Sequence, residues 1–293
     1  MPTHSLTPAD PVQLKVLTYN VHSCRGRGGR PDPGRIAEVI ASAAPDVIAL
    51  QELDVGRART GGVDQAHEIA QHLKMDAHFH PALHVEEEKY GDAILTALPS
   101  RLIRAGPLPS IGEPRGAIWV EIELGDTRVQ VVNTHFGLRS RERLVQAQTL
   151  AGEEWLGSLA CTLHPAILAG DFNAVPRSRA YGFLARGLSK ASLGMPARPT
   201  FPARFPLLRL DHVFTNTRAR ILNCVVIGTP LARRASDHLP LLATVHVTPA
   251  HAPDAVSDTS GGAEVTADVA ESAMAAARLS SAAPAEPRRS SGR

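Results

Sequence analysis

The chain has 293 residues, enough for one large hydrophobic core or two smaller ones. Its net charge of +2 excludes a polycation that binds nucleic acid by charge alone. No run approaches the roughly twenty apolar residues of a membrane helix. The three cysteines are widely spaced and lack metal-finger spacing, and the first residues lack the basic start and apolar run of a signal peptide. We therefore expect reduced thiols and a cytoplasmic protein.

The composition divides the chain into three parts. Residues 1–13 form a short polar lead that we expect to be flexible, and residues 14–248 carry the apolar patterns of a folded domain. Residues 249–293 are mostly Ala, Ser, Pro, Gly and scattered charges. Such a segment cannot bury enough surface to offset its ordering entropy, so we predict a disordered tail there.

Within the domain, apolar runs rich in Val and Ile alternate with helical patterns. The predicted strands are 14–21, 46–52, 92–97, 117–124, 129–136, 165–171, 210–216, 223–228 and 239–247, and the predicted helices are 33–44, 63–73, 140–160 and 177–187. The third helix begins at Ser140 with Arg143 in place of the acid of a capping box, so we expect an incomplete cap. Alternating and fully apolar strands together indicate one α/β domain with packed sheets and outer helices.

Polar side chains recur where these apolar strands begin or end. In "AILAGDFNAVP", residues 166–176, Asp171 and Asn173 follow a buried strand and point to the same side if the chain stays extended. Taken alone, these turn-forming residues before Pro176 favour a turn over a site. The same event recurs at six places, which together supply Asn20, Glu52, His135, Asp171, Asn173, Asp211, Asp237 and His238. Such a set favours a site built on loops that a rigid sheet positions.

The residue types in this set indicate its chemistry. Oxygen ligands without cysteine favour a hard cation such as Mg²⁺ or Mn²⁺. The two histidines add groups that exchange protons near neutral pH. The mildly basic domain suits an anionic substrate without specifying one.

Residues 14–247 resemble the endonuclease/exonuclease/phosphatase superfamily of DNase I-like phosphoesterases. The matching motifs, in order, are "TYNVH", "ALQEL", "GDAILT", "NTHFGL", "GDFNAVP", "LDHVF" and "SDHLPL". Each motif is weak alone, but the ordered set is specific and makes a site at Asp171 and Asn173 the better interpretation. The resemblance implies a four-layer α/β sandwich, with two β-sheets face to face and helices outside. A poorly characterised bacterial subgroup is similar over 135–148 and 198–214.

The resemblance also implies a role for each matching residue. Glu52 would be the principal ligand of Mg²⁺ (or Mn²⁺), with Asn20 and Asp237 close to the ion or its water shell. Asp171 would orient or deprotonate the attacking water, and Asn173 would hold a phosphate oxygen.

The two histidines receive separate roles. His238 would lie beside the phosphate, oriented by Asp211, and His135 would protonate the leaving oxygen. A carboxylate at the far nitrogen of a histidine fixes its tautomer and raises its basicity, which makes the pairing of Asp211 with His238 physically coherent.

Other positions leave alternatives open. Asp92 stands where Asn is more usual, and it either partners His135 or caps a strand. His212 replaces a frequent Tyr and has no assigned role. Arg115, in "EPRGAIW", either binds a substrate phosphate or forms a structural salt bridge. Two further arginines, Arg204 and Arg209, are candidates for the substrate mouth.

The sequence thus predicts a metal-dependent phosphoesterase that hydrolyses a phosphodiester by attack of activated water. The substrate is DNA, a phospholipid or a small phosphodiester, and no stable protein partner is evident. An aromatic content of 4% argues against a single-strand nuclease, because few rings are left to stack on bases. The alternative is a non-catalytic binding module that retains the fold, which predicts the loss of a site residue, although all are present.

Overall fold

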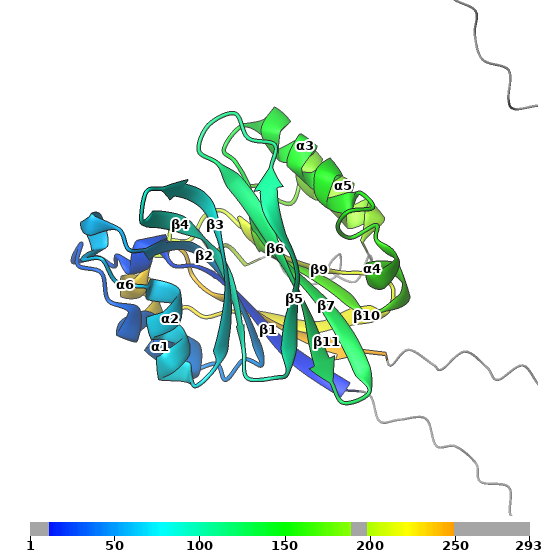
Figure 1. Cartoon of the computed structure of the whole chain (residues 1–293), viewed down its shortest axis with the longest axis horizontal. Coiled ribbons are helices and arrows are strands. Elements are labelled where there is room, and N and C mark those ends of the chain that lie inside the picture. Colours follow the sequence, from blue (N-terminus) through cyan, green and yellow to red (C-terminus); the bar gives the residue numbers. More distant parts are fainter. Residues whose placement is uncertain (1–11, 189–197, 249–293) are drawn as a thin grey trace, which may run out of the picture. The chain divides into compact units, whose positions relative to one another are not determined.

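Two β-sheets pack face to face in the computed structural model, which describes residues 12–188 and 198–248 (Figure 1). The six-stranded sheet has the order β10-β11-β1-β2-β4-β3. Its strands are β1 (Val12–Asn20), β2 (Val47–Val55), β3 (Asp76–Val85), β4 (Glu88–Thr96), β10 (Ala219–Val226) and β11 (Leu241–Val247). The five-stranded sheet has the order β5-β6-β7-β8-β9, with strands β5 (Ser100–Leu108), β6 (Arg115–Leu124), β7 (Thr127–His135), β8 (Ala166–Asp171) and β9 (Asp211–Thr215).

Helices cover the outer face of each sheet, which confirms the four-layer α/β sandwich (Figure 1). On the six-stranded sheet lie α1 (Pro33–Ala41) and α2 (Gln65–Leu73), with α6 (Ala232–Ala235) beside them. On the five-stranded sheet lie α3 (Ser140–Ala151), α4 (Leu159–Leu163) and α5 (Arg179–Gly187). Two short 3₁₀ turns, η1 (His22–Cys24) and η2 (Ala58–Thr60), complete the elements.

The two sheets and the two sets of helices form four layers, and an apolar core lies between each neighbouring pair. These three cores explain the sequence pattern of the inner strands. On β1, Val16 packs between the sheets, whereas its neighbour Leu17 packs under α1 and α2. Successive side chains of a strand point to opposite faces, so a strand that is buried on both faces reads as a continuous apolar run. β8, fully buried from Ala166 to Asp171, reads the same way.

Strand directions bring several strand ends to one end of the sandwich. β1 runs parallel to β2, with Asn20 opposite Gln51, and β7 runs parallel to β8, with His135 opposite Asp171. β9 is antiparallel to β8, and β11 is antiparallel to β1. Asp211 at the start of β9 therefore lies opposite Asp171, and the chain that leads into β11 returns to the end of β1.

The structure corrects the predicted helix 140–160. α3 ends at Ala151, and residues 152–158 turn so that Trp155 enters the core before α4 begins. The N-cap lies one residue before the predicted position, and the cap is incomplete because the N-cap side chain makes no hydrogen bond. The N-cap is Arg139, and Glu142 at the third helical position accepts a hydrogen bond from the backbone N–H of Arg139 at 3.4 Å.

The chain outside the described ranges leaves two predictions untested. Residues 1–11 and 249–293 lie there, so the flexible lead and the disordered tail stay predictions. β1 begins at Val12, two residues before the predicted strand. In the described ranges, no helix is long and apolar enough to cross a membrane.

Candidate active site

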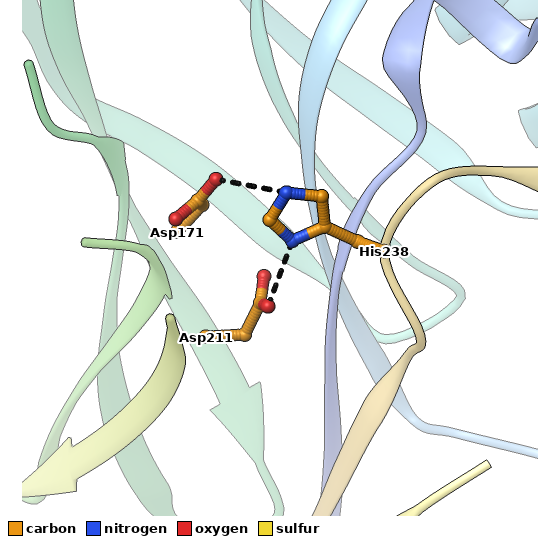
Figure 2. A group of neighbouring side chains, drawn as sticks. All are labelled: Asp171, Asp211 and His238. Atoms are coloured by element: carbon orange, nitrogen blue, oxygen red, sulfur yellow. Dashed lines mark hydrogen bonds and ion pairs between the residues drawn. The ribbon is translucent and has the colours of Figure 1, made fainter. Parts of the chain in front are cut away.

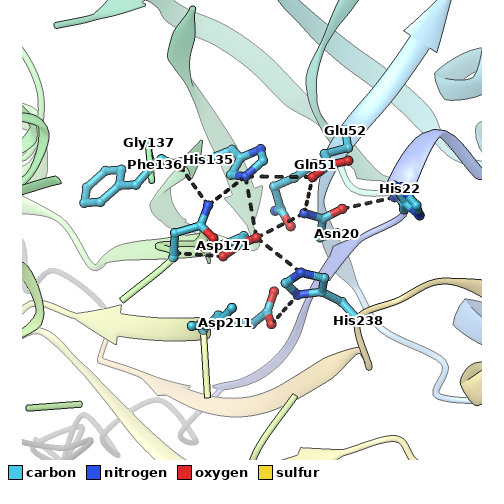
Figure 3. A network of polar contacts seen from close by, with 12 residues as sticks. Asn20, His22, Gln51, Glu52, His135, Phe136, Gly137, Asp171, Asp211 and His238 are labelled. Atoms are coloured by element: carbon cyan, nitrogen blue, oxygen red, sulfur yellow. Dashed lines mark hydrogen bonds and ion pairs between the residues drawn. The ribbon is translucent and has the colours of Figure 1, made fainter. Parts of the chain in front are cut away.

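The side chain of Asn20 connects carboxylates from the two sheets (Figure 3). Its Nδ2 donates to Glu52 Oε1 at 2.8 Å and to Asp171 Oδ2 at 3.0 Å. Its Oδ1 accepts from the backbone N–H of His22 at 3.0 Å. Asn20 is 1% exposed, so its amide has a fixed orientation, and it holds the two carboxylates at one place.

Glu52 reaches this place because β2 is irregular there. The pairing of β2 with β4 shifts register between Leu50 and Leu53, and Glu52 has a left-handed φ of 61°. Such a bulge redirects a side chain. Two side chains hold the backbone of this bulge. Asn133 Nδ2 on β7 donates to the carbonyl of Leu50 at 2.8 Å, and the carboxyl group of Asp92 accepts from the backbone N–H of Glu52.

Asp92 therefore contacts the backbone of Glu52, and neither alternative from the sequence describes it. It lies on β4 and is 2% exposed. Burial raises the pKa of Asp92 to about 8, although Arg115 partly opposes this. The motif "GDAILT" identified Asp92 as a candidate residue. Its contact with the backbone of Glu52 depends on the pairing of β2 with β4.

Asp171, His238 and Asp211 form a line of contacts (Figure 2). His238 Nδ1–H donates to Asp211 Oδ2 at 2.9 Å, and His238 Nε2 lies 3.6 Å from Asp171 Oδ2. Burial alone would lower the pKa of His238, but the carboxylates of Asp211 and Asp171 outweigh it and raise the pKa to about 10. Burial raises the pKa of Asp171 to about 6, although charged His238 opposes this. His238 is thus a cation at neutral pH.

His135 directs Nε2 towards Asp171 and Nδ1 towards Arg115. Arg115 Nη1, which can only donate, lies 3.1 Å from His135 Nδ1, and the side-chain amide nitrogen of Asn173, also a donor, lies 3.1 Å from His135 Nε2. Nε2 also lies 3.5 Å from Asp171 Oδ2. Burial and the nearby Arg115 hold the pKa of His135 well below its usual range. His135 is therefore neutral, and donors approach both of its ring nitrogens.

The stretch 171–173 is both a turn and part of the site. The backbone N–H of Asn173 donates to Asp171 Oδ1 at 2.8 Å, and Asn173 adopts a left-handed φ of 48°. Its Nδ2 donates to the carbonyl of Phe136 at 2.9 Å. The turn that these residue types favour thus fixes the carboxylate of Asp171 and brings Asn173 beside His135.

These groups surround a pocket of about 470 Å³. Of the predicted site residues, Glu52, Arg115, His135, Asp171, Asn173, Asp237 and His238 line it. Asn20 and Asp211 contact lining residues from behind. Arg204 and Arg209 do not line it, and Arg209 is buried elsewhere at 7% exposure.

The lining residues that were not singled out from the sequence include His22, Arg25, Arg59 and Tyr90. His22 stands in "TYNVH" and its Nδ1 lies 3.7 Å from Asp237 Oδ1, so the motif itself contained the signal. Arg25 follows the short turn η1, and Arg59 lies on the short turn η2. No sequence pattern predicted these turns at the strand ends.

The donor set fits a hard cation at Glu52. Glu52 and Asp237 have side chains that are 21% and 43% exposed, and they supply oxygen ligands. Asn20 turns its Nδ2 to Glu52 and its Oδ1 to the backbone N–H of His22, so it orients the carboxylate of Glu52. A second group, Asp171, Asp211 and His238, has possible ligand atoms within 4.8 Å of one another. A cation there would compete with the hydrogen bond between His238 and Asp211 and would face a charged imidazolium. The Glu52 side is therefore the better fit.

Comparison with known proteins agrees with the fold. The family model described as Endonuclease/Exonuclease/phosphatase family matches residues 17–238, so the chain belongs to this family. The family is associated with phosphoesterase and nuclease activity and is typically dependent on divalent metals.

Similar proteins include one curated sequence and several solved structures. The uncharacterized protein YbhP of Escherichia coli is 28% identical over 254 residues, which cover 80% of this chain and 96% of that protein. The endonuclease/exonuclease/phosphatase of Beutenbergia cavernae superposes with a TM-score of 0.67 at 21% identity, covering 81% of this chain and 72% of that one. A mannosyl-6-phosphatase of Bacteroides thetaiotaomicron gives 0.63 at 19% identity, over 79% and 99% of the two chains. Both solved structures share the fold.

Proposed function

We propose that the chain is a divalent-cation-dependent phosphoesterase that hydrolyses a phosphodiester by attack of activated water. The observation that carries this proposal is the bridge that Asn20 makes between Glu52 and Asp171, beside the paired His238 and Asp211. A cation ligand, a base and a charged donor thus face one pocket. A binding module would have no need of this combination.

The pocket also bears on the substrate. Its volume of about 470 Å³ lies in the range of sites for small molecules. This favours a small phosphodiester or the head group of a phospholipid over a segment of DNA duplex.

The cation would be Mg²⁺ or Mn²⁺, held by Glu52 with Asn20 and Asp237 close to it or its water shell, and it would offset charge on the phosphate. Asp171 orients the attacking water and accepts its proton. Both of its oxygens are fixed, by Asn173 N–H and by Asn20 Nδ2. A carboxyl group with a pKa of about 6 is also a stronger base than an ordinary aspartate.

The donors on the other side stabilise the phosphate. Charged His238 directs Nε2–H into the pocket, while Asp211 keeps the ring oriented. Arg115 lines the pocket, and its guanidinium group, which contacts Glu113 and His135 through Nη1, would donate to a phosphate oxygen. The side-chain amide of Asn173 lies beside them and holds another phosphate oxygen.

For His135 we propose hydrogen-bond donation rather than the proton donation that the resemblance implies. Arg115 Nη1 occupies the vicinity of its Nδ1 and disfavours a second proton on the ring. With its proton on Nε2, the neutral ring can still stabilise the leaving oxygen.

The test is a substrate panel of bis(4-nitrophenyl) phosphate, 4-nitrophenyl phosphate, DNA and phospholipid vesicles, assayed with Mg²⁺ and with EDTA. We expect hydrolysis of a diester only with the cation, and a loss on the order of a hundredfold or more in Glu52→Gln. Glu123→Gln, on an exposed position of β6, is the matched control and should keep its activity. Full activity in EDTA after exhaustive dialysis would contradict the metal assignment.

A further inference from the structure

One wall of the pocket carries three arginines, of which the proposed hydrolysis uses only Arg115. Arg25, which follows η1, and Arg59 on η2 line this wall together with Arg115 on β6. We call these three residues the basic wall. The ring of Tyr90 lies beside it, with its centroid 5.5 Å from the guanidinium carbon of Arg59.

Arg59 is held rigidly from behind. Its Nε and Nη2 each donate to one oxygen of Asp54 at 2.7 Å, and the Asp54 side chain is fully buried. Its Nη2 also donates to Ser23 Oγ at 3.1 Å. Nη1 has no hydrogen-bond partner in the part of the chain that the structure describes. The guanidinium group is therefore oriented in advance and keeps two N–H donors for a ligand.

The turn beside Arg59 is strained in a way that serves this wall. His22, Ser23 and Cys24 have successive left-handed φ angles of 48°, 50° and 55°. Left-handed backbone is unfavourable for residues other than glycine and persists only where surrounding contacts impose it. Here Gln65 Nε2 donates to the carbonyl of Ser23 at 2.8 Å. The turn carries Ser23 and Arg25 into the pocket lining.

One charge of the basic wall has no partner: Arg25 donates to the backbone carbonyl of Arg59 and makes no ion pair among the described residues. Arg59 shares Asp54 with Arg57, but Arg57 also pairs with Glu88 at 3.4 Å, so these two arginines are balanced. Arg115 pairs with Glu113 at 2.5 Å, but the Glu113 side chain is 47% exposed at the pocket and can be displaced. An anionic ligand would complete the balance.

We propose that the basic wall binds a second phosphate group of the substrate. The preferred substrate is then a small phosphate ester that carries a further phosphate close to the scissile one. This inference rests on the proposed hydrolysis and specifies which esters enter the same pocket. The acids of the site, Glu52, Asp171 and Asp237, lie where the cation would be, so the two halves of the pocket have opposite charge.

Binding of non-hydrolysable ligands tests the proposal without turnover. Isothermal titration calorimetry compares ethylphosphonate with ethane-1,2-, propane-1,3- and butane-1,4-bisphosphonate, each in Mg²⁺ and in EDTA. We expect at least one bisphosphonate to bind about tenfold more tightly than ethylphosphonate, because an arginine that donates to a phosphate forms charge-assisted hydrogen bonds. Equal binding of mono- and bisphosphonates at every length, in both buffers, overturns the proposal.

Variants assign the preference to Arg59. Arg59→Gln should abolish it, and Arg59→Lys should restore only part, since an ammonium lacks the fork that Asp54 holds. Glu113→Gln should increase it, because the competing carboxylate is removed. The matched control is Arg101→Gln, an arginine 65% exposed in an ion pair with Glu121 away from the pocket, which should change nothing. A preference that survives both Arg59 variants overturns the assignment.

Kinetics separate this proposal from the function on which it rests. The ratio of kcat/KM for the diester thymidine 3′-phosphate 5′-(4-nitrophenyl phosphate) to that for thymidine 5′-(4-nitrophenyl phosphate) should fall in Arg59→Gln. Hydrolysis of esters with no preference for a second phosphate would contradict the basic wall alone. Tight, Arg59-dependent binding of a bisphosphonate by a protein that hydrolyses no ester would contradict the proposed function alone.

Discussion

At the scale of single residues, the pairing of His238 with Asp211 gives a sharp expectation. Asp211 accepts one hydrogen bond from His238 at 2.9 Å, and its other oxygen has no partner among the described residues. Asp211 does not line the pocket, so it can act on a substrate only through His238. Its role would be to orient the ring and keep it charged.

His238→Ala and Asp211→Asn should therefore behave as one unit. Each variant should slow turnover, by on the order of 10² to 10⁴ for His238→Ala. The double variant should lose little more than His238→Ala alone, as coupled catalytic groups do. The measurement is kcat/KM of the four proteins on the diester that proves active. Losses that multiply would show that Asp211 acts independently of His238.

His212 has a structural role that the sequence left unassigned. Its Nε2 donates to the carbonyl of Ala174 at 2.7 Å, and its ring packs against Phe172, Tyr181 and Phe214. Burial lowers the pKa of His212 to about 4. An unfolded chain, with a histidine pKa of about 6.5, takes up this proton first as the pH falls.

The stability that His212 contributes by staying neutral should thus be fully present above pH 6.5 and lost between pH 6.5 and about 4. The loss should reach about 3 kcal/mol at most. His212→Phe should remove this pH dependence, while it lowers stability at pH 7 by about 1 kcal/mol through the lost hydrogen bond. Urea unfolding at several pH values measures both effects. His84→Phe, at an exposed position of β3, is the control, and an unchanged slope in His212→Phe would contradict the assignment.

At the scale of elements, the bulge in β2 depends on the facing sheet. Asn133 on β7 is fully buried and donates to the carbonyls of Leu50 and Ala93 at 2.8 and 2.9 Å. It also accepts from Gln51 Nε2 at 2.7 Å. These contacts satisfy backbone groups that the irregular pairing of β2 with β4 leaves free.

Asn133→Ala should destabilise the domain by about 3 kcal/mol or more, because each buried polar group left without a partner costs about 1–3 kcal/mol. It should also weaken Mg²⁺ binding, because Glu52 loses its support. Asn216→Ala removes donors to two carbonyls at the opposite end of β9, so it should lower stability without changing Mg²⁺ affinity. Chemical denaturation and calorimetry separate the two effects. Equal Mg²⁺ affinity in both variants would contradict a role for the bulge.

The same bulge shows which features of the site could be predicted from the sequence. The apolar run 46–52 predicted a strand with Glu52 at its end, and β2 begins at Val47 as expected. The strand continues to Val55, however, and Glu52 lies within it. What turns its carboxylate to the site is contact with Asn133 and Asp92, on strands distant in the sequence. The identity of the site residue was readable, but the cause of its orientation was not.

Two strands escaped prediction for a related reason. β3 and β5 are edge strands, one in each sheet, and much of their surface is exposed. β3 contains His78, His80 and Pro81, so it lacks the apolar pattern of the inner strands. Inner strands are buried, so their sequences are apolar and can be recognised as strands. β3 and β5 are specified by a neighbour that only the folded chain supplies, whereas the edge strand β9 is buried and was predicted.

At the scale of the whole molecule, the candidate site is formed by residues from both sheets. Asn20 and Glu52 come from the six-stranded sheet, whereas His135, Asp171 and Asp211 come from the five-stranded sheet. The ordered motifs predicted both the sandwich and this gathering, because most of their polar residues lie where strands begin or end, at one end of the fold. The arrangement collects several carboxylates, which repel one another without a cation.

Mg²⁺ should therefore stabilise the whole sandwich. Binding to the folded state alone adds about 2.7 kcal/mol at a free concentration of 100 Kd. In EDTA, Glu52→Gln should be at least as stable as the natural chain, since one repelling charge is gone, and it should gain far less from Mg²⁺. Glu123→Gln should respond to Mg²⁺ as the natural chain does. Thermal unfolding against Mg²⁺ concentration measures these shifts. A shift that survives Glu52→Gln but disappears in Asp211→Asn would place the cation among Asp171, Asp211 and His238, because only that group would then have lost a ligand.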